Sequence, residues 1–179
     1  MIETNRLLIR PMVEEDYLEM HPYMSSEEVL KYDELEPFTK EELKKFIRST
    51  LSEPCFYSVI LKDTKKLIGH LYLGIKMDHE SKIASLGYIF NPIYYRKGYC
   101  SEAAKALINY GFKEMNVDRV EAGCNPENIA SWRVMQKIGL HDDGLQQRKI
   151  SFENDADGNP IFRSHFKYSI SKENWKIES

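Results

Sequence analysis

An α/β (α+β) fold around a mixed sheet is predicted by two features of the sequence. Three strand-like runs separated by short polar turns, at residues 56–61, 67–75 and 83–90, indicate an antiparallel meander. Helix and strand patterns then alternate between residues 101 and 138, which is typical of a β-α-β unit with a parallel strand pair. A length of 179 residues favours a single domain spanning residues 1–179, with room for a sizeable core.

The N-terminal third is predicted to form one strand and two helices, at residues 7–10, 14–24 and 40–51. The strand ends at Pro11, which lacks the N–H group that a sheet ladder needs. Thr39 suits the N-cap of the second helix, because Glu42 follows three residues later as in a capping box. The acidic stretch at 32–37 is predicted to be a loop between the helices.

The remaining elements are predicted to be helices at 101–115 and 125–138 and strands at 119–124, 147–152 and 162–170. The second of these helices has clear boundary signals. Asn125 suits its N-cap, Pro126 its first position, and Gly139 the position just past its end.

Composition and charge narrow the classes to which the protein can belong. A net charge of −3 and a pI near 6.0 argue against nucleic-acid binding, which usually needs a marked basic excess. No run is long and apolar enough for a membrane span, and the N-terminus lacks the pattern of a signal peptide. Three widely spaced cysteines without a CxxC pair indicate neither a zinc site nor a disulfide framework. We therefore expect a reducing, cytoplasmic setting.

The first candidate binding motif is a basic turn that precedes a helix. It consists of Tyr95, Arg96, Lys97, Gly98, Tyr99, Cys100 and Ser101. The basic residues supply charge, the glycine allows close approach of the backbone, and the first amides of a helix point outward. Such a turn suits a pyrophosphate. A polar loop that only caps the helix has the same composition, so the turn alone leaves both interpretations open.

The second motif lies at the start of the helix predicted at 125–138. Asn128 and Ser131 are three residues apart, so they share a helix face near its N-terminus. Asn128 could also cap the helix in place of Asn125. Taken alone, this motif is a well-formed helix start.

Together, the two motifs make the sequence resemble the GNAT N-acetyltransferase family. Within that family it is most similar to the RimJ/RimL-like branch, which includes ribosomal-protein N-terminal acetyltransferases. The resemblance covers nearly the whole chain, through TNRLLIRPM, KLIG, GYIFNP, KGYCSEA, the Asn128 to Ser131 motif, KIGL and FKYSI. It implies the GNAT fold, in which a twisted, mostly antiparallel sheet contains one splayed parallel strand pair and has helices on both faces.

The resemblance also implies that acetyl-CoA is the acyl donor and lies between the splayed strands, here 86–90 and 119–124. The backbone groups that would pair with its pantetheine arm belong to Tyr88, Ile89 and Phe90. Asn128 would contact the same arm, and the turn at 95–101 would hold the pyrophosphate. The acetyl group would pass directly to a neutral amine, with no acyl-enzyme and no metal.

Several positions differ from the family pattern. Tyr95 and Cys100 stand where the family turn usually has Gln or Arg at its start and Gly or Ala at its end. Met135 occupies the place where many members carry a tyrosine as the acid for the leaving thiolate. Ser131 is therefore the candidate donor, as in the RimL-like branch. Ser85 stands where a glutamate often acts as the base.

Candidates for that base are His70, Glu121 and the acidic loop at 32–37. His70 belongs to a strand that is expected to border the substrate groove, and the pKa of histidine suits a base near neutral pH. A partly buried structural histidine is the alternative. Glu121 could instead be a solvated strand residue, and the loop a solvated charged segment that attracts a cationic amine.

The sequence thus predicts an acyltransferase that moves the acetyl group of acetyl-CoA to a primary amine. The acceptor is either a protein N-terminal α-amine, such as that of a ribosomal protein, or a small-molecule amine. The alternative is a non-catalytic acyl-CoA-binding sensor or regulatory module, which the missing Tyr and Glu keep open. As partners we expect no nucleic acid and no membrane, and as assembly a monomer or homodimer.

Overall fold

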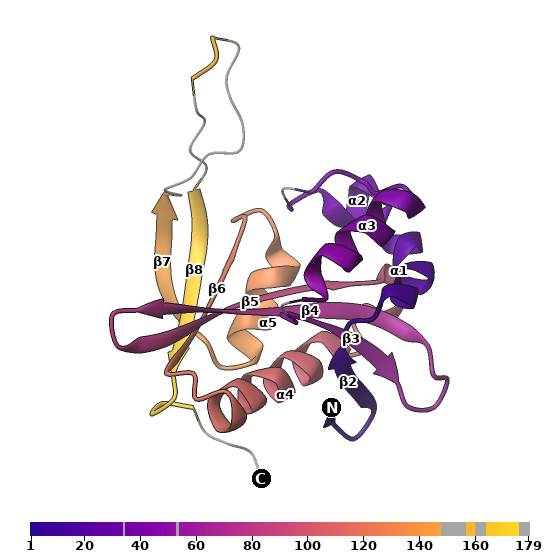
Figure 1. The fold of residues 1–179 in the computed structure, drawn as a ribbon. Coiled ribbons are helices and arrows are strands. Elements are labelled where there is room, and N and C mark those ends of the chain that lie inside the picture. Colours follow the sequence, from indigo (N-terminus) through magenta and orange to yellow (C-terminus); the bar gives the residue numbers. More distant parts are fainter. Residues whose placement is uncertain (34, 53, 148–156, 160–163, 176–179) are drawn as a thin grey trace.

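The computed structural model describes residues 1–33, 35–52, 54–147, 157–159 and 164–175. Eight strands among them form one sheet in the order β1-β2-β3-β4-β5-β6-β8-β7. Neighbouring strands are antiparallel except β5 and β6, which are parallel. Helices flank the sheet on both sides (Figure 1). The mixed sheet and the parallel pair confirm the predicted fold class.

The bounds of the strands are β1 Ile2–Glu3, β2 Leu7–Pro11, β3 Phe56–Leu61, β4 Leu67–Asp78, β5 Ser81–Phe90, β6 Arg119–Cys124, β7 His141–Gln147 and β8 Ser164–Ser171. The helices are α1 Tyr17–Met24, α2 Glu27–Leu30, α3 Lys40–Thr50, α4 Tyr99–Glu114 and α5 Ile129–Lys137. Two 3₁₀ turns, η1 at Glu14–Asp16 and η2 at Pro92–Tyr94, precede α1 and α4. No helix among the described residues is long and apolar enough to span a membrane.

Helices α1 and α3 cover one face of the sheet at its N-terminal end. Met20 and Tyr23 from α1 and Leu43 and Ile47 from α3 are fully or almost fully buried there, in one cluster. The predicted capping box at the start of α3 is confirmed, because the Thr39 N–H donates to Glu42 over 2.9 Å and the Glu42 N–H donates to the Thr39 hydroxyl over 3.3 Å. Its local signal was sufficient to place α3.

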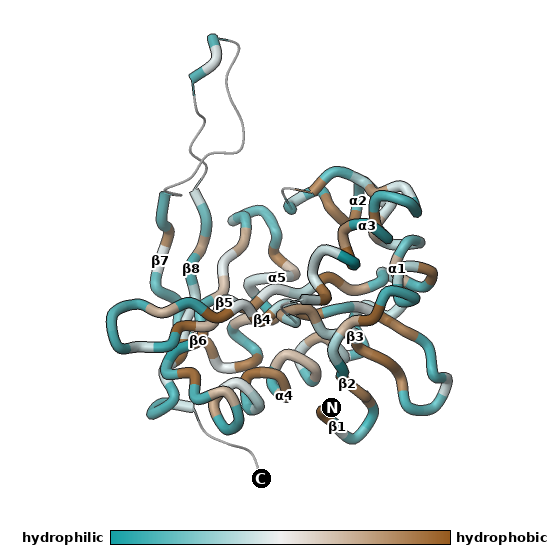
Figure 2. Tube along the Cα trace, in the orientation of Figure 1, coloured by the Kyte–Doolittle hydropathy of each residue, from teal (hydrophilic) through white to brown (hydrophobic). Residues whose placement is uncertain are grey.

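Helix α4 packs on the opposite face, against the larger core. Its buried side includes Ala104, Leu107 and Ile108. At Gly111 a Cβ atom would lie 3.3 Å from a Leu73 methyl carbon, so the small residue lets the helix approach β4 closely. Figure 2 shows the hydrophobic stretches concentrated in the central strands and the hydrophilic ones in the connecting loops.

The parallel strands β5 and β6 pair along only part of their length. Register pairs run from Ile83↔Arg119 to Leu86↔Ala122 and stop there, although β5 continues to Phe90. Beyond Leu86 the edge of β5 that faces β6 has no strand partner among the described residues. The two strands therefore separate at the point that the family resemblance implies.

Some predicted boundaries differ from the structure. Helix α5 begins at Ile129 with Asn128 as its N-cap, rather than with Asn125. The reason is that the Asn125 side chain accepts from the Glu127 N–H over 2.9 Å and closes a separate turn before the helix. The last pair of strands begins earlier, with β7, and most of the predicted strand at 147–152 lies outside the described residues.

Candidate active site

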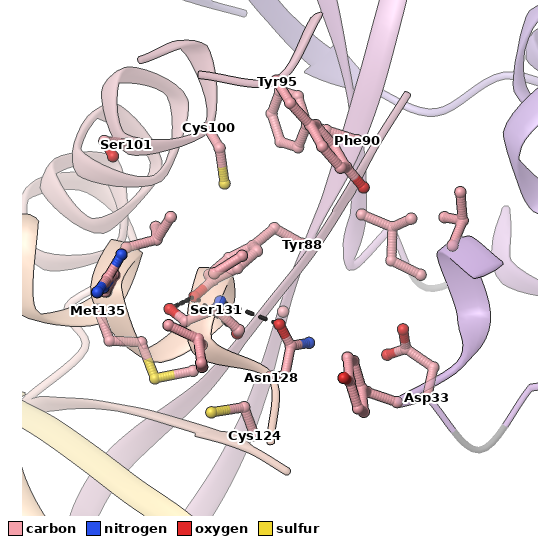
Figure 3. A pocket seen from close by; sticks show the side chains of 18 of the residues that line it. Asp33, Tyr88, Phe90, Tyr95, Cys100, Ser101, Cys124, Asn128, Ser131 and Met135 are labelled. Carbon is pink, nitrogen blue, oxygen red and sulfur yellow. Dashed lines mark hydrogen bonds between the residues drawn. The ribbon is translucent and has the colours of Figure 1, made fainter. Parts of the chain in front are cut away.

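A pocket of about 900 Å³ opens where β5 and β6 separate. Its walls come from the ends of both strands, from the turn before α4, from the first turns of α5, and from the segment after α2 (Figure 3). Most residues that the sequence predicts as binding residues line this pocket: Tyr88, Ile89, Phe90, Tyr95, Arg96, Gly98, Tyr99, Cys100, Ser101, Asn128 and Ser131. His70 and Lys97 are not among them.

The turn before α4 has the backbone geometry of an anion site. Arg96 has φ +60° and Gly98 has φ +80°, and Gly98 is the N-cap of α4. Left-handed residues that alternate with right-handed ones turn successive N–H groups toward one point, which suits a phosphate. The N-terminus of a helix of this length adds to the attraction. An L side chain in place of Gly98 would be strained at this φ.

Arg6, from the segment before β2, supports this turn. Its guanidinium donates to the Lys97 carbonyl over 3.0 Å and to the Glu102 carboxylate over 2.7 Å. It also lies over the Tyr99 ring, 4.4 Å from the centroid. The sequence does not reveal this contact, because it joins residues more than ninety positions apart. The Lys97 amine, meanwhile, lies over the Tyr94 ring rather than in the pocket.

Three cationic side chains line the pocket on the side of the turn and α5: Arg96, Arg133 and Lys137. Arg133 and Lys137 are one helical turn apart on α5. Within the described part of the chain, none of the three forms an ion pair with a carboxylate. Exposed cations that converge on a pocket without carboxylate partners favour an anionic ligand.

Ser131 lies at the inner end of the pocket, held by two neighbours. The Asn128 side-chain oxygen accepts from the Ser131 N–H over 3.1 Å, which caps α5. The Tyr88 hydroxyl donates to the Ser131 carbonyl over 2.9 Å and lies 3.2 Å from the Ser131 Oγ. Figure 3 shows Tyr88 and Asn128 on either side of Ser131, each joined to it by a dashed line. The structure thus brings together Asn128 and Ser131 as predicted, and adds Tyr88 through its side chain.

Two cysteines line the same pocket, Cys100 from α4 and Cys124 from the end of β6. Burial raises the pKa of both thiols, and for Cys124 hydrogen bonding with Ser131 and the Trp132 N–H only partly offsets the effect of burial. Both side chains are therefore protonated thiols at neutral pH. For Cys100 this favours the packing role over the reactive one, despite its place at a helix N-terminus.

His70 lies in β4 on the sheet face that α1 covers, and its side chain is buried. The Tyr23 hydroxyl is 3.0 Å from His70 Nδ1, and the two rings stack with centroids 5.9 Å apart. Burial lowers the pKa of His70 to about 4, so the imidazole is neutral at physiological pH. Its role as a base stays a prediction, and the structure gives it a packing partner instead of a place at the pocket.

The other candidates for the base have different surroundings. Glu121 is paired in register with Ser85, so it stands beside the position of the missing glutamate. Its carboxylate, however, lies 3.0 Å from the Lys167 amine and 3.2 Å from the Arg119 guanidinium. Asp33, from the acidic loop, is the one carboxylate among the described residues that line the pocket. It lies across the pocket from α4 (Figure 3).

The residues of the pocket suit a long, anionic ligand with an extended arm. The turn and the cations offer a phosphate site, the free edge of β5 offers backbone groups to an extended chain, and Ser131 offers a hydroxyl at the inner end. Among the described residues, no group of three or more His, Cys, Asp or Glu could hold a metal ion.

Comparisons with known proteins agree with this description. The profile of the acetyltransferase (GNAT) domain matches residues 6–141. The chain is 40% identical to the uncharacterized N-acetyltransferase YnaD of Bacillus subtilis (strain 168), over 97% of this chain and 98% of that protein. The crystal structure of a GNAT acetyltransferase from Bacillus anthracis is 37% identical, with a TM-score of 0.82 over 96% of this chain and 98% of that one. A spermidine N-acetyltransferase from Vibrio cholerae, solved with CoA and spermine, shares the fold. It has a TM-score of 0.77 at 17% identity, over 96% of this chain and 98% of that one.

Proposed function

The chain belongs to the GNAT acetyltransferase family, and on that basis we propose that it transfers the acetyl group of acetyl-CoA directly to a primary amine. Acetyl-CoA is consumed in this reaction, so it is a substrate. The acceptor is a protein N-terminal α-amine, such as that of a ribosomal protein, or a small-molecule amine such as a polyamine.

The observation that carries the proposal is the arrangement of the pocket along its length. At one end lies a turn with left-handed residues, beside cations that form no ion pair with a carboxylate among the described residues. The edge of β5 beyond Leu86, which has no strand partner in the described part of the chain, runs inward, and the hydroxyls of Tyr88 and Ser131 lie at the inner end. A pyrophosphate, an extended arm and a thioester follow one another in the same order in acetyl-CoA. Arg96, Arg133 and Lys137 would hold its phosphate groups by charge.

The chemistry of the pocket supports direct transfer. A neutral amine attacks the thioester carbonyl, the new C–N bond forms, the C–S bond breaks, and the nitrogen releases one proton to a base or to solvent. The departing sulfur gains a hydrogen bond from the Ser131 hydroxyl. The protonated thiols of Cys100 and Cys124 are poor nucleophiles, which argues against an acetylated cysteine as an intermediate.

Asp33 supports a cationic acceptor. Amines are mostly ammonium ions at neutral pH, and a carboxylate at the pocket wall attracts them before they lose a proton. A polyamine or a peptide N-terminus fits this requirement equally well, so the acceptor has to be identified by experiment.

The proposal is tested by following CoA thiol release from acetyl-CoA with a panel of acceptors. The panel contains peptides with free N-termini, polyamines, amino acids and aminoglycosides, and each acceptor is also run in its N-acetylated form as a matched control. We expect release that depends on one acceptor class and on its free amine. Tight CoA binding without release from any acceptor would contradict the proposal and favour a binding module.

A further inference from the structure

We propose that Tyr88 is a positioning residue for the Ser131 hydroxyl and strengthens the hydrogen bond that Ser131 gives to the leaving sulfur. The inference rests on the proposed acetyl transfer and adds a residue to it. The sequence shows that α5 carries Met135 where many family members have a tyrosine. The structure supplies a tyrosine hydroxyl to the same pocket from β5.

The geometry of the pair is the first support. The Tyr88 hydroxyl lies 2.9 Å from the Ser131 carbonyl oxygen and 3.2 Å from its Oγ, so its single proton can be donated to either atom. Both distances are within hydrogen-bonding range. Because Asn128 holds the Ser131 N–H from the other side, the backbone of Ser131 is fixed and only its hydroxyl can rotate.

The second support is the surroundings of the pair. Tyr88 packs against the apolar core, and Tyr88 and Ser131 are both among the residues that line the pocket. When the Tyr88 proton points at Oγ, the Ser131 proton is directed away from Tyr88, either to the Cys124 thiol or to a ligand in the pocket that both residues line. Hydrogen bonds in such a chain polarise one another, so the bond from Ser131 to an anionic sulfur is strengthened.

The pair acts without losing a proton. As the C–S bond breaks, negative charge collects on sulfur, the Ser131 O–H points at it, and the Tyr88 O–H points at the Ser131 Oγ. Burial raises the pKa of Tyr88, which keeps its hydroxyl protonated throughout. The acceptor nitrogen releases its own proton to a base or to solvent, so neither Tyr88 nor Ser131 has to lose one.

The kinetic test compares Tyr88→Phe, Ser131→Ala and the double variant, with the acceptor found in the panel. Tyr88→Phe keeps the ring and removes only the hydroxyl. We expect it to lower kcat about 10-fold, the fold-change that corresponds to one hydrogen bond, with the KM for acetyl-CoA unchanged. In the Ser131→Ala background the same change should have no further effect, because Tyr88 acts only through Ser131. Tyr168→Phe, which removes a hydroxyl that contacts Gln136 and Asp142 and does not line the pocket, is the matched control and should keep kcat.

A second test needs no acceptor. The pKa of the bound CoA thiol is measured from the absorbance of its thiolate as the pH rises. The complex with desulfo-CoA, which lacks the thiol, is the reference, and subtracting its absorbance removes the contribution of the protein's own cysteines. We expect Ser131→Ala, which removes the hydrogen bond to the thiolate, to raise this pKa most relative to the wild type, and Tyr88→Phe, which weakens that bond, to raise it by less.

The outcomes separate the two proposals. Unchanged kcat and an unchanged thiol pKa in Tyr88→Phe, with wild-type turnover present, would overturn the role of Tyr88 alone. An equal loss from Tyr88→Phe with and without Ser131 would also overturn it, since Tyr88 would then act independently. Absence of turnover in the wild type would overturn the proposed function, whereas the thiol pKa would still report on the pair.

Discussion

Two tyrosine hydroxyls in this protein each meet the side chain of a residue that the sequence singles out as catalytic, but their surroundings differ. Tyr23 reaches His70 on the face covered by α1, where His70 is 4% exposed. Tyr88 reaches Ser131 at the inner end of the pocket. In the first pair, the rings stack and the aromatic ring of Phe56 packs nearby. In the second, both residues line the pocket, although the Tyr88 hydroxyl is itself largely buried.

The difference shows that a polar side chain with a partner is not sufficient to define a catalytic group. In the Tyr23–His70 pair, here called the closed pair, the Tyr23 hydroxyl and His70 Nδ1 are partners, which stabilises the core because a buried polar atom without a partner is costly. In the Tyr88–Ser131 pair, here called the open pair, the Ser131 hydroxyl is the donor that we propose is directed at the pocket. Access, rather than residue type, distinguishes the two, and the variants below test that distinction.

Acid titration should produce the largest change in unfolding free energy, and it acts through His70 in the closed pair. The unfolded chain protonates His70 near pH 6.5, whereas the folded protein protonates it only near pH 4. Stability that is fully present above pH 6.5 should therefore fall as the pH drops through this window, by about 3 kcal/mol in total. Denaturant unfolding of the wild type and His70→Asn at pH 7, 5.5 and 4 measures the difference.

The same His70→Asn variant also tests the predicted role of His70 as a base. If the variant folds, binds CoA and keeps its turnover, His70 has a structural role and is not the base. Loss of turnover with intact CoA affinity would support the base and contradict the distinction between the two pairs.

Removing the hydroxyl of the closed pair should have the next largest effect on stability. Tyr23→Phe leaves His70 Nδ1 buried without its partner, which costs about 2 kcal/mol of unfolding free energy. The Kd for CoA should not change, because Tyr23 does not line the pocket. Tyr88→Phe should instead affect the pocket more than the unfolding free energy. A loss of unfolding free energy in Tyr88→Phe comparable to that in Tyr23→Phe would contradict the difference between the two pairs.

The cap of α5 links stability to the open pair. Asn128→Ala removes the side-chain acceptor for the Ser131 N–H, which keeps only the Asn128 backbone carbonyl, and should cost about 1 kcal/mol, measured by thermal or chemical unfolding. It should also lower kcat, because Ser131 loses one of its two supports. Asn125→Ala is the matched control, since Asn125 accepts from Glu127 in the preceding turn and does not touch Ser131. Equal kinetic losses in both variants would mean that the turn as a whole, rather than Ser131, is affected.

The smallest effect is expected at the pocket wall. Asp33→Asn should raise the KM for a cationic acceptor about 3-fold at low salt, and the difference should shrink as salt screens the charge. Asp78→Asn, at the end of β4 and outside the pocket, is the control and should leave the KM unchanged. An Asp33→Asn effect that does not depend on salt would argue against simple attraction.

Local signals account for the parts of the fold that the sequence predicts well. The strands at 56–61 and 119–124 have the predicted bounds, and the capping box at Thr39 places the start of α3. Helix α2 is missed because four residues are too few for a periodic pattern. The start of α5 is misplaced because Asn125 and Asn128 both form caps, and local sequence does not rank them.

The candidate site likewise has some parts that local motifs predict and others that they do not. The backbone turn at 95–101 and the cap at Asn128 lie within short motifs, so the sequence could indicate them. The contacts of Arg6 with the turn and of Tyr88 with Ser131 join distant parts of the chain. Only the fold brings such residues together, so neither contact could be predicted from spacing.

The position of β8 has a consequence for how the protein becomes competent to bind its ligand. Strand β6 forms one wall of the pocket, and its outer neighbour is β8, which pairs with it from Arg119↔Ser171 to Cys124↔Phe166. Residues 125–163 separate β6 from this neighbour in the sequence, so β6 keeps an unpaired edge until β8 is in place. Non-local pairing of this kind is slow to form. Docking of β8 is therefore the step that both completes this wall of the pocket and protects the edge of β6 from edge-to-edge aggregation.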